Sequence, residues 1–179
     1  LIFPEKGLTK SHLRSLNHFI KNNYSPLVIC NLPLSTQDQK EILSKCWTLI
    51  ERKNYGYDFG GYRDGVLFLS EKIRDLDKLI LINDSTWFPI TNNNSFMDFI
   101  DNSNLDFIGA TSHYGFKRQR LPSEKTGLSK LQFNFNNKNF HYASYALGFS
   151  KKILKDENFL KFWKNLRLSG TKNLVVRRG

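Results

Sequence analysis

The chain has 179 residues, of which 40% are hydrophobic and 24% are charged. This balance suits one globular domain with its own core and argues against disorder. No apolar run approaches the roughly 20 residues that cross a bilayer. The net charge of +11 predicts a basic surface, which attracts nucleic acid, anionic membranes or phosphorylated ligands. The sequence starts without Met and closes on the strand-like stretch NLVVRRG, so we expect a piece of a longer protein, truncated at both ends.

The first half of the chain alternates helices with short strands. Apolar residues recur at helical spacing over 9–22, which predicts an amphipathic helix. A second helix, capped by Ser35 or Thr36, is predicted between two strands. The other elements expected in this half are strands at 26–30, 47–52 and 79–82 and a helix that starts near Gly61.

The second half contains more consecutive strands. A short helix is predicted at 94–103, strands at 105–112, 131–136 and 142–150, a loop at 112–130, and two short helices or one broken helix at 151–166. The alternation in the first half favours an α/β layered fold. We therefore expect one domain over residues 1–179 with a mixed, mostly parallel central sheet, in which residues of about 1–90 bind a nucleotide and those of about 91–170 face an acceptor.

Two polar clusters follow predicted strands. One is NYGYDFGG, after the strand that ends near Arg52, and the other is NDS, after the strand that ends at Ile82. Ligands of open α/β sheets bind outside the carboxyl ends of the strands, so we expect both clusters to line one crevice. Glycines there let the backbone approach a ligand, and Asp58 and Asp84 would suit a hard cation that bridges to phosphates. Helix capping and turn formation are the alternative roles of these carboxylates.

The histidines and cysteines do not predict a metal site. None of the four histidines pairs with another at ligand spacing, and His12 and His18 are expected to be surface or packing residues of the first helix. His113 and His141 lie near strand ends, so both are candidates to reach the crevice. The two cysteines are expected to be buried free thiols.

Five blocks of the sequence resemble the rhamnan synthesis protein F family, bacterial glycosyltransferase-type proteins of cell-surface polysaccharide assembly. The blocks are RKNYGYDFGGYRDGV, KLILINDSTWFPI, LDFIGATSHY, FHYASYALGFSKKIL and NFLKFWKNL, and their order and spacing match from about residue 27 to the end. The first block is the most specific. The same blocks are similar to the GT-A glycosyltransferase layout, which implies a Rossmann-like three-layer sandwich and transfer of a sugar, rhamnose in the family's name, from a nucleotide-sugar donor to a growing polysaccharide or lipopolysaccharide.

The resemblance also implies a set of site residues. NDS takes the place of the acidic metal motif, with Asn83 and Ser85 where carboxylates are usual, so Asp84 is the expected ligand of a Mn²⁺ or Mg²⁺ ion. Ser144 and Tyr145 are expected on the acceptor side, where Ala143 replaces the family's usual Gln. The residues expected to bind the donor are Asn54, Gly56, Tyr57, Asp58, Gly60, Gly61, Arg63, Asn83 and Asp84.

Glycosyl transfer requires a stabilised leaving diphosphate and, in an inverting enzyme, a base for the acceptor hydroxyl. We expect Asp84 to act on the diphosphate through a cation, helped by Arg63 or by a basic residue of the segment FKRQR. Lys117, Arg118 and Arg120 are the alternative if no metal binds. The candidate bases are His113, which ranks first, Asp106 and His141.

The basic surface fits a cytoplasmic protein that contacts the inner face of the membrane, where lipid-linked acceptors reside. An apolar stripe at helical spacing in the last block (Phe159, Phe162, Trp163 and Leu166) is typical of core packing, with a membrane edge as the alternative. Two other functions compete with transfer. One is a non-catalytic domain that keeps the fold and binds a saccharide or a partner; the other, less favoured because no reading helix occurs, is a nucleic-acid-binding module.

Overall fold

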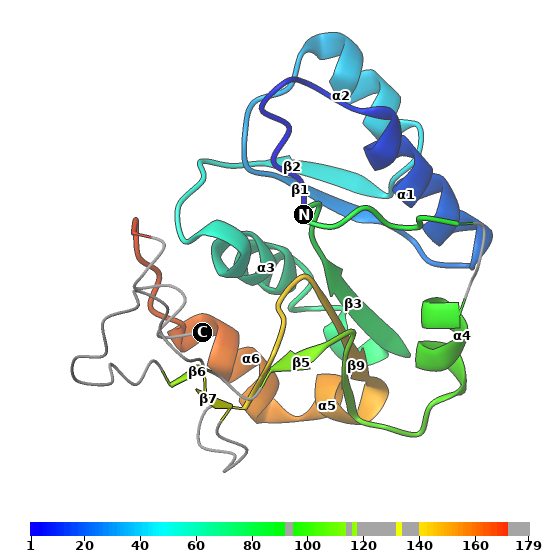
Figure 1. Ribbon diagram of the computed structural model, residues 1–179. Helices are drawn as coiled ribbons and strands as arrows, with labels where there is room; N and C mark the ends of the chain where they lie inside the picture. Colours follow the sequence, from blue (N-terminus) through cyan, green and yellow to red (C-terminus); the bar gives the residue numbers. More distant parts are fainter. Residues whose placement is uncertain (92–94, 114–115, 118–131, 134–139, 172–179) are drawn as a thin grey trace, which may run out of the picture.

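The computed structural model describes residues 1–91, 95–113, 116–117, 132–133 and 140–171. Its secondary structure follows the predicted order (Figure 1), except that two short strands, at 112–113 and 116–117, occur in the segment predicted to be a loop. The helices are α1 (Lys10–Lys21), α2 (Thr36–Leu43), α3 (Tyr57–Phe68), α4 (Ser95–Asn102), α5 (Lys151–Lys155) and α6 (Glu157–Asn165), with a 3-10 turn at Ile73–Asp75. The strands are β1 (Leu27–Cys30), β2 (Thr48–Glu51), β3 (Lys78–Ile82), β4 (Phe107–Gly109), β5 (Ser112–His113), β6 (Phe116–Lys117), β7 (Gln132–Phe133), β8 (His141–Tyr142) and β9 (Ala146–Ser150).

Local sequence signals explain where the first helices begin. The Thr9 hydroxyl accepts the backbone N–H of His12, and His12 reciprocates at the Thr9 N–H, so α1 starts with a closed capping box. Ser35, one of the two predicted caps, accepts the N–H of Asp38 at the start of α2. The predicted start of α3 at Gly61 is wrong, because this helix begins four residues earlier, at Tyr57.

The strands form a mixed set of sheets. β1 and β2 are parallel, whereas β3, β9 and β4 form an antiparallel sheet in the order β3–β9–β4. Two small antiparallel pairs, β5–β8 and β6–β7, complete the described strands. The α/β class is therefore confirmed, but the expected predominance of parallel pairing is wrong. The reason is β9, which returns between β3 and β4 and runs opposite to both.

The first three residues connect the two larger sheets. Ile2 bridges Cys30 in parallel, with its N–H bonded to the Ile29 carbonyl across 2.8 Å. On the other side, the Leu1 nitrogen donates to the carbonyl of Ile82, also across 2.8 Å. Residues 1–3 therefore lie between the carboxyl ends of β1 and β3.

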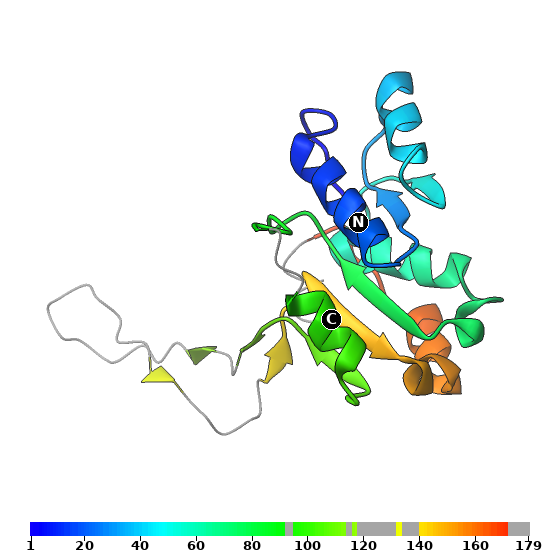
Figure 2. The ribbon, with the colours of Figure 1, turned by 90° about the vertical axis from the view of Figure 1, so that its right-hand side faces the viewer.

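The hydrophobic core is divided between the two faces of the strands. Leu16 of α1 and Ile42 of α2 pack on Val28 at one face. Leu81, on the other face, belongs to a larger cluster with α3, α5 and α6 that contains Tyr62 and Trp163. Figure 2 shows β3 and β9 nearly edge-on, with α1 and α4 on one side and α3 and α6 on the other. Because β1 and β2 are parallel and residues 1–3 bridge the ends of β1 and β3, the carboxyl ends of these three strands lie at the same end of the molecule.

The apolar stripe near the end of the chain is mainly core. Phe159 is 8% exposed and Trp163 is 2% exposed, and both lie in the larger cluster, while Phe162 remains half exposed. Of the two alternatives for this stripe, core packing is thus the one that the burial supports. Within the described residues, no helix combines the length and apolar character needed to cross a lipid bilayer.

Candidate functional site

The glycine–tyrosine turn delivers Asp58 to the start of a helix. Gly56 adopts a left-handed conformation with φ of 78° and is the N-cap of α3, a backbone angle that side chains with a Cβ rarely adopt. A Cβ on Gly56 would also lie 2.8 Å from the side chain of Leu168. The turn therefore requires glycine at position 56 for two reasons, the left-handed backbone and the close approach of Leu168. Its consequence is that Asp58 sits in the first turn of α3, where the helix dipole stabilises a negative charge.

Asn83 joins the two predicted polar clusters. Its Nδ2 donates to Oδ2 of Asp58 across 2.8 Å, and its Oδ1 accepts from the hydroxyl of Ser85. The residue is only 6% exposed. Its amide has therefore lost its hydrogen bonds to water, and the bonds to Asp58 and Ser85 replace them. The two predicted clusters therefore meet at this contact, which is made by Asn83 and not by Asp84. That they line one crevice stays a prediction.

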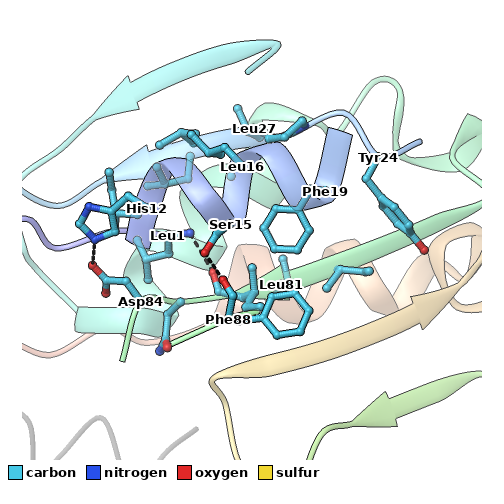
Figure 3. Close-up of a pocket in the computed structure, with 18 of the residues that line it drawn as sticks. Leu1, His12, Ser15, Leu16, Phe19, Tyr24, Leu27, Leu81, Asp84 and Phe88 are labelled. Carbon is cyan, nitrogen blue, oxygen red and sulfur yellow. Dashed lines mark hydrogen bonds and ion pairs between the residues drawn. The ribbon is translucent and has the colours of Figure 1, made fainter. Parts of the chain in front are cut away.

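Asp84, the residue after Asn83, is bound by residues near the start of the chain. Its Oδ2 accepts from the N–H of Phe3 at 2.7 Å and from Nε2 of His12 at 3.2 Å. The other ring nitrogen of His12 accepts the Thr9 N–H, which leaves Nε2 as the donor. Figure 3 shows His12 reaching down from α1 to the carboxylate. Partial burial opposes ionisation, but the hydrogen bonds from His12 and Phe3 outweigh it, so the pKa of Asp84 lies below its ordinary value.

Arg52, which directly follows β2, stabilises the glycine–tyrosine turn through three hydrogen bonds. The guanidinium donates to Oδ2 of Asp64, to Oδ1 of Asn31 and to the carbonyl of Tyr55, each across 2.6 Å. Nδ2 of Asn31 in turn donates to Oδ1 of Asn54 across 3.1 Å. The planar fork of arginine suits these three directions at once. Asn54, one of the predicted donor contacts, is therefore fixed by two residues that the sequence analysis did not single out.

The predicted acceptor-side pair lies beside the same region. The hydroxyl of Tyr62 on α3 donates to the carbonyl of Ser144, and the N–H of Asn83 donates to the carbonyl of Tyr145. Burial, together with the charges of Asp58 and Asp84, raises the pKa of Tyr62 well above its ordinary value. Tyr62 stays protonated and serves as a donor that ties α3 to the segment before β9.

The candidate bases separate into two places. His113 and His141 are direct partners in the β5–β8 ladder, which continues past the ends of β4 and β9. Asp106 precedes β4 and binds Nζ of Lys152 at 2.6 Å and the Ser150 hydroxyl at 3.0 Å. Since Ser150 pairs with Lys78 at the start of β3, the length of that strand separates Asp106 from Asp84, roughly 20 Å at the usual rise.

Other predicted donor residues are engaged in packing. Arg63 donates from Nε to the carbonyl of Trp163 at 3.0 Å and thereby caps the end of α6. The Tyr57 hydroxyl bonds the carbonyl of Gly170. Gly60 is buried directly under the carbonyl of Tyr55, where a Cβ would lie 2.1 Å from that oxygen. Tyr57 and Arg63 thus connect α3 to the last part of the described chain, and Gly60 packs against the turn.

The described residues contain no group of three or more His, Cys, Asp or Glu side chains that would hold a metal ion. Asp84 offers one carboxylate with Oδ2 already bonded twice. Mg²⁺ is often bound through only one or two carboxylates plus substrate phosphates. The residues present fit that mode of binding and do not form a complete protein cage. Arg118 and Arg120, the predicted alternative, lie outside the described residues, as does the side chain of Lys117.

Sequence reasoning missed His12, Asn31 and Arg52 as parts of this region. His12 was expected on the surface or in packing, yet its side chain is only 11% exposed and contacts Asp84. A usable signal was present, because Thr9 and His12 have capping-box spacing, which fixes the direction of the histidine ring. For Asn31 and Arg52 the only signal is their position at the ends of adjacent strands.

The decisive comparison is a match to the model of rhamnan synthesis protein F over residues 27–176. The chain belongs to the rhamnan synthesis protein F family. The matched range covers both polar clusters, the β5–β8 ladder and α6, and so includes every candidate residue described above except His12 and the bridging residues 1–3.

Two relatives of the chain are longer proteins. An uncharacterized protein of Sinorhizobium fredii, y4gN, is 30% identical over 177 residues, which is 99% of this chain and 42% of that protein. The virulence protein VirA of Vibrio anguillarum is 27% identical over 114 residues, or 63% of this chain and 29% of VirA. The chain thus spans less than half the length of these relatives. No solved structure matches it.

Proposed function

We propose that this chain is the nucleotide-sugar-binding part of a glycosyltransferase that acts in polysaccharide synthesis. Membership in the rhamnan synthesis protein F family supports the process. The observation that carries the proposal is the Asn83–Asp58 hydrogen bond, because it brings the turn after β2 and the end of β3 together at one end of the molecule. Ligands of α/β proteins bind at this end of the strands.

For the donor site we propose the layout that the resemblance to the GT-A glycosyltransferases implies. Asn54 and Tyr55 are exposed at the rim, while Asp58 and Asn83 lie deeper. A ribose and its diphosphate offer hydroxyl groups to the carboxylate of Asp58 and phosphate oxygens to donors at the start of α3. Asp84 would hold a divalent cation, which would supply positive charge to stabilise the leaving diphosphate.

The acceptor would enter from the side of Ser144, Tyr145 and the β5–β8 ladder. His113 and His141 sit opposite each other there, and a neutral imidazole is suited to take a proton from a sugar hydroxyl near neutral pH. Asp106 is the weaker candidate because Lys152 and Ser150 occupy its carboxylate. We therefore propose a histidine of this ladder as the base, with His113 first.

A second candidate is a non-catalytic domain that binds a saccharide or a partner protein. It is favoured by the reduced metal motif, in which Asp84 is the only carboxylate and its Oδ2 is used by His12 and Phe3. Such a domain would retain binding without transfer. The basic surface also suits a nucleic-acid-binding module. Such a module would bind nucleic acid but would show no saturable binding of nucleotides.

Calorimetric titration with nucleoside diphosphates and nucleotide sugars, with and without Mn²⁺, tests the proposal. The variants are Asp58→Asn and Asp84→Asn, and the matched control is Asp77→Asn, an exposed carboxylate paired with Lys151 far from the site. We expect the first two to weaken nucleotide binding at least tenfold while circular dichroism stays unchanged, and the control to bind normally. Binding that survives both substitutions contradicts the proposal. Sugar transfer by the longer protein, lost in His113→Ala or Asp84→Asn, then separates an enzyme from a binding domain.

A further inference from the structure

Trp87 and Ile90 are the most exposed large hydrophobic side chains in the part of the chain that the structure describes. Trp87 is 80% exposed and Ile90 is 78% exposed, whereas the other exposed residues of this kind reach at most 58%. Both belong to residues 85–91, the stretch after Asp84, which we call the tryptophan segment. Apolar area grouped on a surface in this way marks a site of contact with a protein or a membrane.

The tryptophan segment is anchored between two helices through Phe88. The Phe88 ring lies edge-on to His18 of α1, with ring centroids 5.2 Å apart, and to Phe96 of α4 at 5.8 Å. Its carbonyl also accepts a hydrogen bond from the Ser15 hydroxyl, and the next residue, Pro89, is buried. Figure 1 shows the segment passing along α1 toward α4. Two residues held in place by packing therefore separate the exposed pair.

The adjoining side of α1 is cationic. Arg14, His18 and Lys21 lie four and three positions apart, so they share one side of the helix, and His18 contacts Phe88. Burial lowers the pKa of His18, and the positive charges of Arg14 and Lys21 lower it further, which agrees with two cations close to this ring. α1 contains no Asp or Glu, and the tryptophan segment contains no charged residue. Positive charge and exposed apolar area thus adjoin each other.

The acidic side chains of the neighbouring α4 offset this charge only in part. Asp101 lies 3.6 Å from Nζ of Lys78, so its charge is already balanced by a cation of β3. Asp98 is the other acidic residue of α4 and is exposed. It stands against the three exposed cations of α1, which are Lys10, Arg14 and Lys21.

We propose that the tryptophan segment and the adjoining side of α1 form a face that docks on a membrane containing anionic lipids. Tryptophan prefers the level of the lipid headgroups, and an aliphatic side chain such as Ile90 gains by entering the acyl boundary. Lysine and arginine side chains reach the anionic phosphates of the headgroups. A sugar ring would use the flat indole and a nucleic acid would use the cations, but neither would use the isoleucine.

Docking at this face would hold the candidate site close to the lipid surface. Trp87 follows Asp84 by three positions, which span at most about 11 Å of extended chain. Membrane docking uses Trp87, Ile90 and the cations of α1, whereas the proposed nucleotide site uses Asp58 and Asp84. Either one can therefore fail while the other holds.

The test is sedimentation of the chain with vesicles of phosphatidylcholine alone and with vesicles that contain about one-third phosphatidylglycerol. We expect binding to the anionic vesicles to be at least about tenfold stronger and to weaken as salt is raised. Trp87→Ala combined with Ile90→Ser should weaken it about tenfold or more, because apolar burial is lost. Arg14→Gln combined with Lys21→Gln should cause a similar loss on anionic vesicles only.

Two control variants change similar side chains elsewhere. Trp47→Ala removes a tryptophan that is 52% exposed. Lys161→Gln combined with Lys164→Gln removes two exposed cations of α6, which lies on the other side of the sheet from α1 (Figure 2). Both controls should bind vesicles like the natural chain. An equal loss in the α6 variant would overturn the proposal, because it would show that binding follows overall charge and not this face.

Tryptophan fluorescence gives a readout from the face itself. The chain has three tryptophans, of which Trp163 is buried, so a Trp47→Phe chain reports mainly on Trp87. Its emission should shift to shorter wavelength with anionic vesicles and stay unchanged with neutral ones. An unchanged emission, or vesicle binding that survives the Trp87 and Ile90 substitutions, would overturn the proposal.

Sedimentation velocity without lipid separates a membrane from a second copy of the chain. We expect the natural chain and the Trp87→Ala, Ile90→Ser variant to sediment alike. If the natural chain forms a dimer that the variant loses, the face binds a second copy and the membrane proposal is wrong. Circular dichroism of every variant confirms that it is folded.

Discussion

Asn83 and Asp58, 25 positions apart in sequence, are joined by a 2.8 Å hydrogen bond between the amide nitrogen of one and a carboxylate oxygen of the other. Asn83 is almost completely buried, so its amide depends on protein partners. A double-mutant cycle with Asn83→Ala and Asp58→Ala should give a coupling of about 1–2 kcal/mol in the free energy of unfolding, as expected for residues that share a bond.

Urea denaturation of the two single variants and the double variant measures this coupling. Asn104→Ala, at an exposed position, is the control for loss of an asparagine and should show no coupling to Asp58→Ala. Strictly additive effects at positions 58 and 83 would mean that the contact does not hold the two segments together.

Arg52 should be intolerant of even a conservative change. Its side chain is only 10% exposed and bonds Asp64, Asn31 and the Tyr55 carbonyl. Arg52→Lys keeps the charge but loses the planar fork, so we expect a loss of about 2–3 kcal/mol in unfolding free energy. Arg167→Lys, near the end of the described chain, is the control, and a similar loss there would contradict the assigned role of the fork.

Gly56 and Gly7 allow backbone strain to be separated from steric conflict. Both have positive φ, 78° and 81°, but a Cβ would meet Leu168 at 2.8 Å in Gly56 and only Asp38, at 3.5 Å, in Gly7. Gly7→Ala should cost about 1–2 kcal/mol, the usual penalty of the left-handed conformation. Gly56→Ala should cost clearly more. Thermal unfolding of both variants measures the difference, and equal losses would rule out the close contact with Leu168.

Asp84 should give stability that disappears in acid. Its folded-state pKa is depressed despite partial burial, because His12 and Phe3 bond the charged form. A depressed carboxyl pKa contributes stability above the unfolded value, near 4, which is lost as pH falls through the folded value. Asp84→Asn should therefore be less stable than the natural chain at pH 7, by about 1–3 kcal/mol, and the gap should narrow below about pH 4. A gap that stays constant from pH 7 to pH 3 would show that the charge of Asp84 does not matter for folding.

The two neighbouring aromatic residues of α6 should respond very differently to truncation. Trp163→Ala removes a side chain that is 2% exposed within the larger core cluster, so a loss of about 3–5 kcal/mol is expected. Phe162→Ala, at a half-exposed position, should cost about 1 kcal/mol or less. Chemical denaturation tests the pair, and a reversed order would restore the membrane-edge alternative for this stripe.

The sequence by itself determined the order of helices and strands, the α/β class and the family. These depend on local signals, such as the apolar period of α1, the capping box at Thr9 and the continuous apolar run of β3, which act over a few residues. It also placed Asp58 and the NDS segment at the ends of strands, from which their proximity could be predicted.

Only the tertiary structure decided which side chains meet. That Asn83 bonds Asp58 and that Arg63 caps α6 depends on how helices pack across the sheet, and sequence spacing carries no information on these contacts. For His12, the capping-box spacing indicated the direction of the ring, but not that Asp84 would be its partner. The direction of β9 was decided in the same way, because its pairing with β3 and β4 joins residues more than 35 positions apart. The physical reason is that hydrogen-bond periodicity is local, whereas burial and pairing are properties of the whole folded chain.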